Sequence, residues 1–388
     1  MNQAAEFVSQ LFIETFKSAP EHVFRAPGRV NLLGDYSDCY DGLTICCAVN
    51  VYTWLAVRPR QDGKFRVVFH HTALKGEQLS AGSVYEWFAG IEGPPIDDAD
   101  ALNYLKGITS ELVRSGLSLT GLDLAVVSTI PKNTGLASTA ALQTAFGTAL
   151  GLCCNQQLTP MAVAQLAQRG ESLYLSHTCG VVSQMSCVLA QPDSALMIDS
   201  LDMDCQPIPM PQTLTIAVIK PVSVEAKTEA KRQARQEHCQ AFAEHFGVAS
   251  LRCLNRNQLH SKERESCTRF FDEVQHLLGE NERAHQLVGA LRRDDPGRIS
   301  ELMQASHHSL IGALHPDNQQ AQAVTDFLHG FLGNRGGARM TEDHTVVALI
   351  PSHEITDLLL ELQTRFTQCD SYMCELAGAA GAVGVSRE

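Results

Sequence analysis

The stretch TIPKNTGLASTAALQTAFG, residues 129–147, leaves an apolar strand, passes a glycine and becomes a helix that begins with small residues. The first N–H groups of a helix lack intrahelical partners and lie at the positive end of its dipole, so small residues there let a polyanion approach the backbone. Ser138 and Thr139 add hydroxyls that a phosphate or its magnesium ion can use. Taken alone, the stretch is more commonly a packing corner between a strand and a helix.

The composition is that of an acidic globular protein. The chain has 388 residues, 44% of them hydrophobic, which is enough for two domains with buried cores. Its net charge of -13 opposes binding to nucleic acid or to an anionic membrane, because both favour clustered Lys and Arg. The N-terminal segment lacks the basic region and apolar core of a signal peptide, and no run approaches the ~18 apolar residues of a membrane span. We expect a cytoplasmic protein without a nucleic-acid or membrane partner.

The 13 cysteines are odd in number, and several lie in apolar segments such as ICCAVNVYTWLAV. They are therefore predicted to be mostly small buried side chains rather than disulfides. The paired Cys or His spacing of zinc sites is absent from the sequence.

Strands and helices alternate along the first half of the chain. The segment CQPIPMPQ at 205–212 then interrupts this pattern, because proline cannot occupy a helix interior and is rare in a central strand. We predict a domain junction there and an α+β fold in two domains, residues 1–206 and 207–388. The expected strands cover 43–59, 64–70, 122–130, 214–220 and 345–350, and the expected helices cover 99–116, 136–153, 160–176, 224–246, 281–293, 296–313, 319–332 and 353–366.

A second stretch, FRAPGRVNLLGDYSDCYDGLTICCAVN at 24–50, concentrates charge among glycines. It is interpreted as a turn that carries Arg29, Asp35, Asp38 and Asp41 and ends in a buried strand. Charges packed this closely beside apolar segments indicate a polar site, and a solvated turn is the competing explanation.

Five segments resemble, in chain order, the motifs of galactokinase, which belongs to the GHMP small-molecule kinases. They are residues 24–50, 131–142, 170–184, 303–310 and 336–351, so the resemblance extends over nearly the whole chain. It implies a GHMP-kinase-like fold with the active-site cleft between two domains. It also implies ATP and Mg²⁺ as cofactors, and phosphate transfer to the anomeric hydroxyl of galactose.

The resemblance also assigns catalytic and sugar-binding positions. Arg29 corresponds to the arginine that neutralises charge near the transferred phosphate, and Ser183, in GVVSQ, stands at the position of the aspartate base. Asp38 and Gly180 correspond to sugar contacts. Three further sugar positions differ in residue type: Asp35 in place of glutamate, Tyr36 in place of histidine and Arg232 in place of tyrosine.

On the nucleotide side, Thr139 and Glu171 correspond to the hydroxyl and the carboxylate near magnesium. Ala101 stands where the family has a tryptophan beside adenine, and the phosphate loop, KNTG, has one glycine fewer and a new lysine. The nucleotide-binding positions implied by the resemblance are Lys132, Gly135, Leu136, Ser138, Thr139 and Ala101.

Two departures from the family affect the chemistry most. The hydroxyl of Ser183 is not a base near neutral pH, and a positioned general base is typically worth about 10² to 10⁴ in rate. MTEDH at 340–344 stands where the family has M-T-G-G-G-F-G-G, and it is three residues shorter. Its two carboxylates, Glu342 and Asp343, are expected to repel phosphates and to weaken ATP binding.

Two functional hypotheses remain. In the first, the chain is a galactokinase paralogue with little or no catalysis, which serves as a sugar or nucleotide sensor or a binding partner, or is a remnant. In the second, it is an active kinase for another small sugar or polyol that works without the aspartate base, because positioning and electrostatics carry most of phosphoryl transfer. The shortened loop weighs against the second hypothesis, and Lys132 supports it by offering a new phosphate contact.

Overall fold

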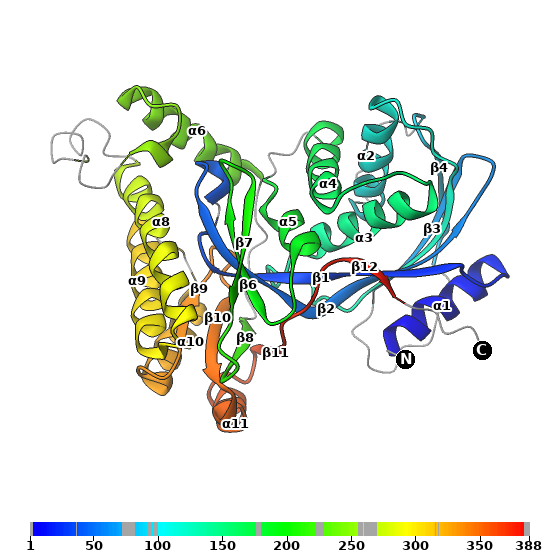
Figure 1. The fold of residues 1–388 in the computed structure, drawn as a ribbon. Coiled ribbons are helices and arrows are strands. Elements are labelled where there is room, and N and C mark those ends of the chain that lie inside the picture. The colour runs from blue at the N-terminus through cyan, green and yellow to red at the C-terminus, as the bar shows by residue number, and fades with distance from the viewer. Residues whose placement is uncertain are drawn as a thin grey trace.

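The computed structural model describes residues 3–35, 37–71, 82–91, 93, 95, 100–175, 180–221, 229–254, 259, 270–314, 316 and 318–383. Two sheets organise this part of the chain, each with its own helices (Figure 1). The first sheet contains β1 (His22–Leu33), β2 (Leu43–Pro59), β3 (Lys64–His71), β4 (Tyr85–Phe88), β5 (Leu122–Ser128), β6 (Ser194–Asp199), β7 (Asp204–Pro209) and β12 (Gly381–Val383). The second contains β8 (Leu214–Lys220), β9 (Gly337–Met340), β10 (Val346–Pro351) and β11 (Asp370–Cys374) in the order β11-β8-β10-β9.

Helices cover both faces of the first sheet because its strands are apolar on both sides. In β2, Leu55 and Val57 pack into the core beneath α2, α3 and α4, while Trp54 and Ala56 face the opposite way. Helix α1 packs against that second face (Figure 1). The helices of this lobe are α1 (Gln3–Phe16), α2 (Asp100–Arg114), α3 (Ser138–Cys153), α4 (Pro160–Tyr174) and α5 (Val182–Leu189).

The second sheet is covered by long helices on one side of the molecule. A separate apolar cluster joins this sheet to α10 through residues such as Ala348, Ile350, Val324 and Leu328, all of them fully buried. The helices of this lobe are α6 (Glu229–Phe246), α8 (Phe271–Arg292), α9 (Pro296–Leu314), α10 (Gln319–Leu332) and α11 (Ile355–Arg365).

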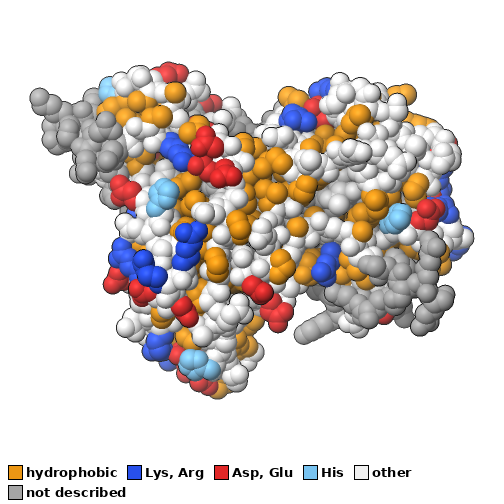
Figure 2. Space-filling view, viewed as in Figure 1, with side chains coloured by type: hydrophobic (Ala, Val, Ile, Leu, Met, Phe, Trp, Pro, Cys, Tyr) orange, Lys and Arg blue, Asp and Glu red, His pale blue; other side chains and the backbone are white. Residues whose placement is uncertain are grey.

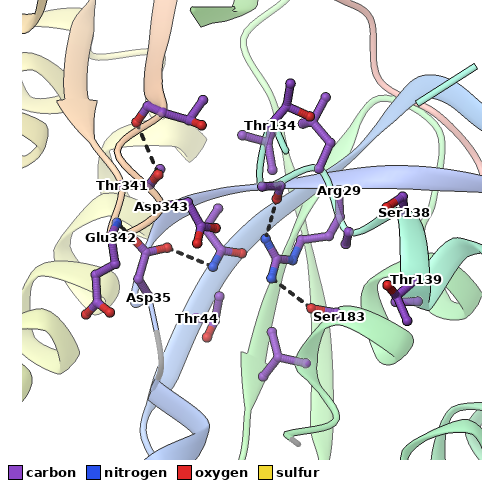
Figure 3. A pocket seen from close by; sticks show the side chains of 18 of the residues that line it. Arg29, Asp35, Thr44, Thr134, Ser138, Thr139, Ser183, Thr341, Glu342 and Asp343 are labelled. Carbon is purple, nitrogen blue, oxygen red and sulfur yellow. Dashed lines mark hydrogen bonds between the residues drawn. The ribbon is translucent and has the colours of Figure 1, made fainter. Parts of the chain in front are cut away.

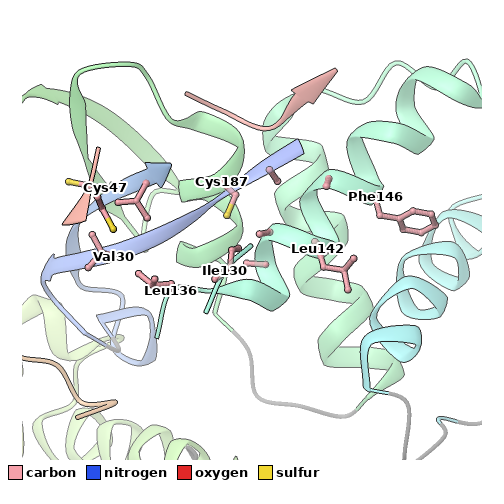
Figure 4. Packing of buried hydrophobic residues seen from close by; sticks show 14 of the residues in the cluster. Val30, Cys47, Ile130, Leu136, Leu142, Phe146 and Cys187 are labelled. Atoms are coloured by element: carbon pink, nitrogen blue, oxygen red, sulfur yellow. The ribbon is translucent and has the colours of Figure 1, made fainter. Parts of the chain in front are cut away.

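The two lobes share one hydrophobic core. Ile216 and Val347 from the second sheet belong to the same buried cluster as Leu33 and Phe146 from the first lobe. Figure 4 shows the part of this cluster in which α3 packs against β1. Strand β12 also returns from the C-terminal part of the chain to pair with β1.

Pro207 and Pro209 lie in β7, which among the described strands pairs only with β6 and so forms a sheet edge, where a missing N–H donor is tolerated. The second sheet begins soon afterwards, at Leu214. The division of the chain at residues 206 and 207 stays a prediction. Figure 2 shows a notch between the two lobes, with acidic and basic side chains interspersed on this face.

The predicted α+β class is confirmed, and two local predictions need correction. Arg29 lies within strand β1 and not in a turn, because the apolar residues around it are buried in the sheet. Helix α8 begins at Phe271, ten residues before the expected start at 281, since its first turns pack apolar residues such as Val274 and Leu277 into a cluster with α6. Within the described residues, no helix is long and apolar enough to cross a membrane.

Candidate active site

A cavity of about 360 Å³ opens where the two lobes meet. Its walls come from β1, the loop before α3, the first turns of α3 and α5, and the loop between β9 and β10. Arg29, Gly135, Gly180 and Ser183, which are far apart in the sequence, all line it. Figure 3 shows Arg29 and Ser183 facing each other in this cavity. The convergence expected from the sequence is therefore present.

Arg29 connects the loop before α3 to helix α5. Strand β1 has a register shift at Pro27 and Gly28, and a Cβ on Gly28 would lie 2.9 Å from the Leu136 carbonyl oxygen, so this part of β1 lies directly against the loop. The Arg29 backbone N–H donates to that same carbonyl at 3.0 Å. Its Nη1 donates to the Gly135 carbonyl at 3.2 Å and its Nη2 to Ser183 Oγ at 2.7 Å. Both side-chain bonds therefore go to neutral acceptors.

The loop at 131–137 presents backbone to the cavity. Gly135 has a φ of +68° and Ala137 a φ of 57°, so the chain turns through left-handed conformations immediately before α3. Ala137 provides no side-chain cap, so the first N–H groups of α3 stay open to a ligand. Buried Leu136 anchors the loop in the core, and Ser138 and Thr139 line the cavity.

Thr139 and Glu171, the two residues of the magnesium assignment, both line the cavity. The carboxylate of Glu171 accepts a hydrogen bond from Gln143 Nε2 at 3.0 Å, which orients it. Among the residues that the structure describes, no group of three His, Cys, Asp or Glu could hold a metal by itself. A hydroxyl and one carboxylate nevertheless fit Mg²⁺, which commonly completes its shell with water and substrate phosphates.

Asp35 is held by buried partners on the sugar side. Its Oδ1 accepts from Asn31 Nδ2 at 2.9 Å, and its Oδ2 accepts from Arg339 Nη2 at 2.9 Å and from the Glu342 N–H at 3.3 Å. The Arg339 side chain is fully buried, and although burial disfavours its charge, Asp35 and Glu280 raise the pKa of Arg339. Asp35 Oδ2 thus contributes to a contact between the lobes, while Oδ1 is bound within the first lobe by Asn31.

Asp38 lies directly over Gly180, since a Cβ at residue 180 would fall 1.4 Å from its Oδ2. Only glycine fits there, so the carboxylate and the backbone of residue 180 meet at the cavity wall. Tyr36 and the side chain of Arg232 lie outside the described residues.

Two of the nucleotide-binding positions assigned from the sequence lie outside the cavity lining. Lys132 and Ala101 do not line the cavity: Lys132 is exposed and accepts a bond from Lys220 Nζ through its carbonyl, while Ala101 packs against the core. Glu342 lines the cavity and its carboxylate forms an ion pair with Arg235, and the expectation that it repels phosphates stays a prediction. Asp343 lines the cavity.

Sequence reasoning missed two buried charges behind the site. Glu280 of α8 is fully buried, accepts from the Gly34 N–H and Ser306 Oγ at 3.0 Å each, and pairs with Arg283 at 2.6 Å. Burial alone raises its pKa, but Arg283, His276 and Arg339 lower the pKa of Glu280 to about 2. The other buried charge is Arg339. In the sequence it stands between Ala338 and Met340, and an arginine between apolar residues was the signal that could have indicated its burial.

Comparison with known families identifies the architecture around this cavity. The model of the galactokinase galactose-binding signature matches residues 10–59, which include Arg29, Asp35 and Asp38. The model of the GHMP kinases N terminal domain matches residues 103–191, which include the loop before α3, Glu171 and Ser183. The chain carries a galactokinase galactose-binding signature and a GHMP kinase N-terminal domain.

Solved structures agree with this galactokinase-like fold. Lactococcus lactis galactokinase, solved in complex with galactose, has a TM-score of 0.83 at 20% identity, with 98% of this chain and 100% of that chain covered. Methanococcus jannaschii mevalonate kinase has a TM-score of 0.62 at 15% identity, covering 92% and 99%. Streptococcus pneumoniae phosphomevalonate kinase, in complex with phosphomevalonate and AMPPNP, also reaches 0.62, at 12% identity and with 93% and 99% covered.

Proposed function

We propose that this galactokinase-like chain binds a galactose-like sugar and that ATP-dependent phosphate transfer to the sugar is weak or absent. The observation that carries the proposal is the bond between Arg29 and Ser183, with a hydroxyl where the resemblance places a carboxylate base. A hydroxyl cannot take the proton of the attacking sugar oxygen near neutral pH. The proposal includes a cytoplasmic location and small-molecule ligands, and the acidic net charge of -13 supports the absence of nucleic acid as a partner.

The sugar side of the cavity supports the binding half of the proposal. The galactose-binding signature includes Asp35 and Asp38 of this wall, and the structurally similar Lactococcus lactis enzyme was solved with galactose. Asp38 and the backbone at Gly180 offer acceptor and donor groups to sugar hydroxyls. Asp35 is already bound by Arg339 and Asn31, so its part is to hold this wall in place.

ATP and Mg²⁺ form the other half of the proposed site. Thr139 and Glu171 would hold the metal, and the open N–H groups at the start of α3 would face the nucleotide phosphates. Bound Mg-ATP supplies the phosphoryl group for transfer. Arg29 would neutralise charge near that group, and Ser183 would orient Arg29 without moving a proton.

One observation favours an active kinase for another small sugar or polyol. Arg29, Thr139 and Glu171 remain assembled around a single cavity, and phosphoryl transfer depends mainly on positioning and charge stabilisation. Such an enzyme would act on a more acidic or better-oriented hydroxyl.

Calorimetric titration and a transfer assay distinguish these functions. The protein is titrated with galactose, with a panel of other sugars and polyols and with Mg-ATP, and formation of sugar phosphate and ADP is followed at saturating Mg-ATP. We expect heat of binding with galactose, weak binding of Mg-ATP and little product. Robust phosphorylation of galactose would contradict the proposal, and turnover of another compound alone would establish the second function.

The Gly180→Ala variant tests whether the sugar binds beside Asp38 and Gly180. The added methyl group would collide with Asp38, so sugar binding should be lost. Retention of galactose binding by this variant would place the sugar elsewhere.

A further inference from the structure

The segment between β1 and β2 that carries Asp38, residues 37–42, closes on itself. We call it the sugar loop, because the proposed function places Asp38 against the sugar. The Ser37 carbonyl accepts from the Tyr40 N–H at 3.1 Å and from the Gly42 N–H at 2.7 Å. These bonds shape the loop, but they do not fix where it lies on the molecule. The place of Asp38 at the cavity wall therefore depends on contacts with other segments.

Tyr40 anchors the tip of the sugar loop in the second lobe. Its side chain is buried in a cluster with apolar residues of α6 and α8, among them Phe242 and Leu277. The hydroxyl donates to the Leu277 carbonyl at 3.1 Å, and the Tyr40 carbonyl accepts from Ser250 Oγ at 3.1 Å. Gly42 lies against the ring, since a Cβ at residue 42 would fall 2.5 Å from two of the ring carbons. A methyl group there would therefore displace the ring or the loop.

A second anchor comes from the 3-10 turn at Leu251–Cys253, which follows α6. Arg252 Nη1 donates to the Asp41 carbonyl at 3.1 Å. The same guanidinium pairs with Asp199 at the end of β6, with Nη2 2.5 Å from Oδ2. Arg252 therefore ties both the sugar loop and the edge of the first sheet to this turn of the second lobe.

We propose that Tyr40 and Arg252 are positioning residues for the sugar, which hold the sugar loop so that Asp38 lies at the cavity wall. The inference rests on the proposed function, since it takes Asp38 as a sugar contact. Among the described residues, neither Tyr40 nor Arg252 lines the cavity, so both act through the loop. When the loop leaves this position, the fraction of molecules that can bind sugar falls, and the apparent affinity falls by the same factor.

The test is galactose affinity in the Arg252→Met variant. Methionine keeps an unbranched side chain but donates no hydrogen bond to the Asp41 carbonyl. We expect galactose to bind at least about tenfold more weakly than to the unmodified protein, and Mg-ATP, whose proposed contacts lie on α3 and α4, to bind equally well. A variant that is merely less folded would lose the same factor for both ligands. Calorimetry measures both affinities, and urea denaturation gives the folded fraction without any ligand.

The Gly42→Ala variant disturbs the sugar loop at its other anchor. The added methyl group would displace Tyr40 while Arg252 is unaltered, so galactose affinity should fall here as well. The matched control is Arg298→Met, which breaks an exposed pair with Glu301 on α9, outside the cavity. It should leave both affinities unchanged.

Two outcomes would overturn the inference. One is a folded Arg252→Met protein with normal galactose affinity, and the other is a loss of galactose affinity no larger than its folded fraction explains. If Arg252→Met does not fold, Gly42→Ala decides between the same outcomes. Absence of galactose binding in the unmodified protein would instead contradict the proposed function, and the inference would fail with it.

Discussion

At the scale of single residues, the contact between Arg29 and Ser183 matters most for phosphate transfer, because position 183 is where a general base is expected. A carboxylate at position 183 would lie beside the Arg29 guanidinium, which would hold its pKa low and keep it ionised as a base. The other departures from the galactokinase motifs, in the β9–β10 hairpin and at the nucleotide-binding positions, would remain. Groups that act together in catalysis are strongly non-additive when several are missing.

We therefore predict that Ser183→Asp alone gives no galactokinase turnover approaching ~1 s⁻¹, the low end of the usual range for enzymes. Galactose 1-phosphate and ADP are measured for both proteins at saturating Mg-ATP. The control is Ser183→Asn, which has a similar side-chain size without a base. Turnover above this level in Ser183→Asp only would show that the base is the sole defect.

Glu280 supports the sugar-binding wall from behind. It accepts the Gly34 N–H, and Gly34 has a φ of +80° at the bend that leads to Asp35 and Asp38. Glu280→Gln leaves the Arg283 charge without its partner, and breaking a buried pair costs about 3 to 5 kcal/mol.

We expect Glu280→Gln to lower the free energy of unfolding by about 3 kcal/mol and to weaken galactose binding. Urea denaturation and calorimetry measure the two effects. Glu282→Gln, on the exposed side of the same helix, should change neither quantity appreciably. A stable Glu280→Gln protein with normal sugar affinity would remove Glu280 from this role.

At the scale of elements, Arg235 joins three segments that are distant in the sequence. From α6 it binds Glu273 of α8 and Glu342 of the hairpin, whose side chains are 13% and 6% exposed. Burial by itself lowers the pKa of Arg235, but the two carboxylates raise it, so the guanidinium stays charged.

Arg235→Met should destabilise the protein by about 3 kcal/mol, since two largely buried carboxylates lose their counter-charge. Arg335→Met is the comparison, because its pair with Glu354 is half-exposed on the arginine side and such surface pairs are worth about 0 to 1 kcal/mol. Chemical denaturation of both variants gives the difference. Equal, small losses would mean that the hairpin is not held by Arg235.

At the scale of the whole molecule, one core joins the two lobes. Residues from both sheets share a buried cluster, and β12 completes the first sheet from the far end of the chain. We predict a single calorimetric unfolding transition for the full chain, and no stable fold for residues 1–206 expressed alone. Two separate transitions, or an independently folded N-terminal piece, would instead support the division predicted at residue 206.

Two buried histidines make the whole molecule sensitive to acid. Burial lowers the pKa of His276 to about 4, while burial, His329, Arg339 and His308 lower that of His307 to about 3. Between pH ~6.5 and these values only the unfolded chain binds the proton, so stability falls as pH falls. Each histidine contributes up to about 1.4 kcal/mol per pH unit in its window. Urea midpoints at several pH values from 7 to 4.5 measure this slope, which should flatten in His276→Gln and His307→Gln.

Local sequence determined most of the elements. The apolar runs in 43–59 and 214–220 predict β2 and β8, and the periodicity in 319–332 predicts α10 at its observed bounds. The helix that begins with small residues was expected from 136 and begins at Ser138, and the glycine turn before it was also visible, because turns depend on neighbouring residues. Strand β1 was missed because its glycines and charges resemble a turn until the neighbouring strands pair with it.

Only the tertiary structure decided what each charged side chain contacts. Glu342 and Asp343 are adjacent acids in one turn, yet Glu342 pairs with Arg235 while Asp343 lies over Gly135. Arg29 and Ser183, 154 residues apart, meet because β1 and α5 pack in the same lobe. Secondary structure depends on neighbours along the chain, which a sequence displays. The energy of a charge depends on its burial and its partners in space, and these exist only after the two lobes have come together.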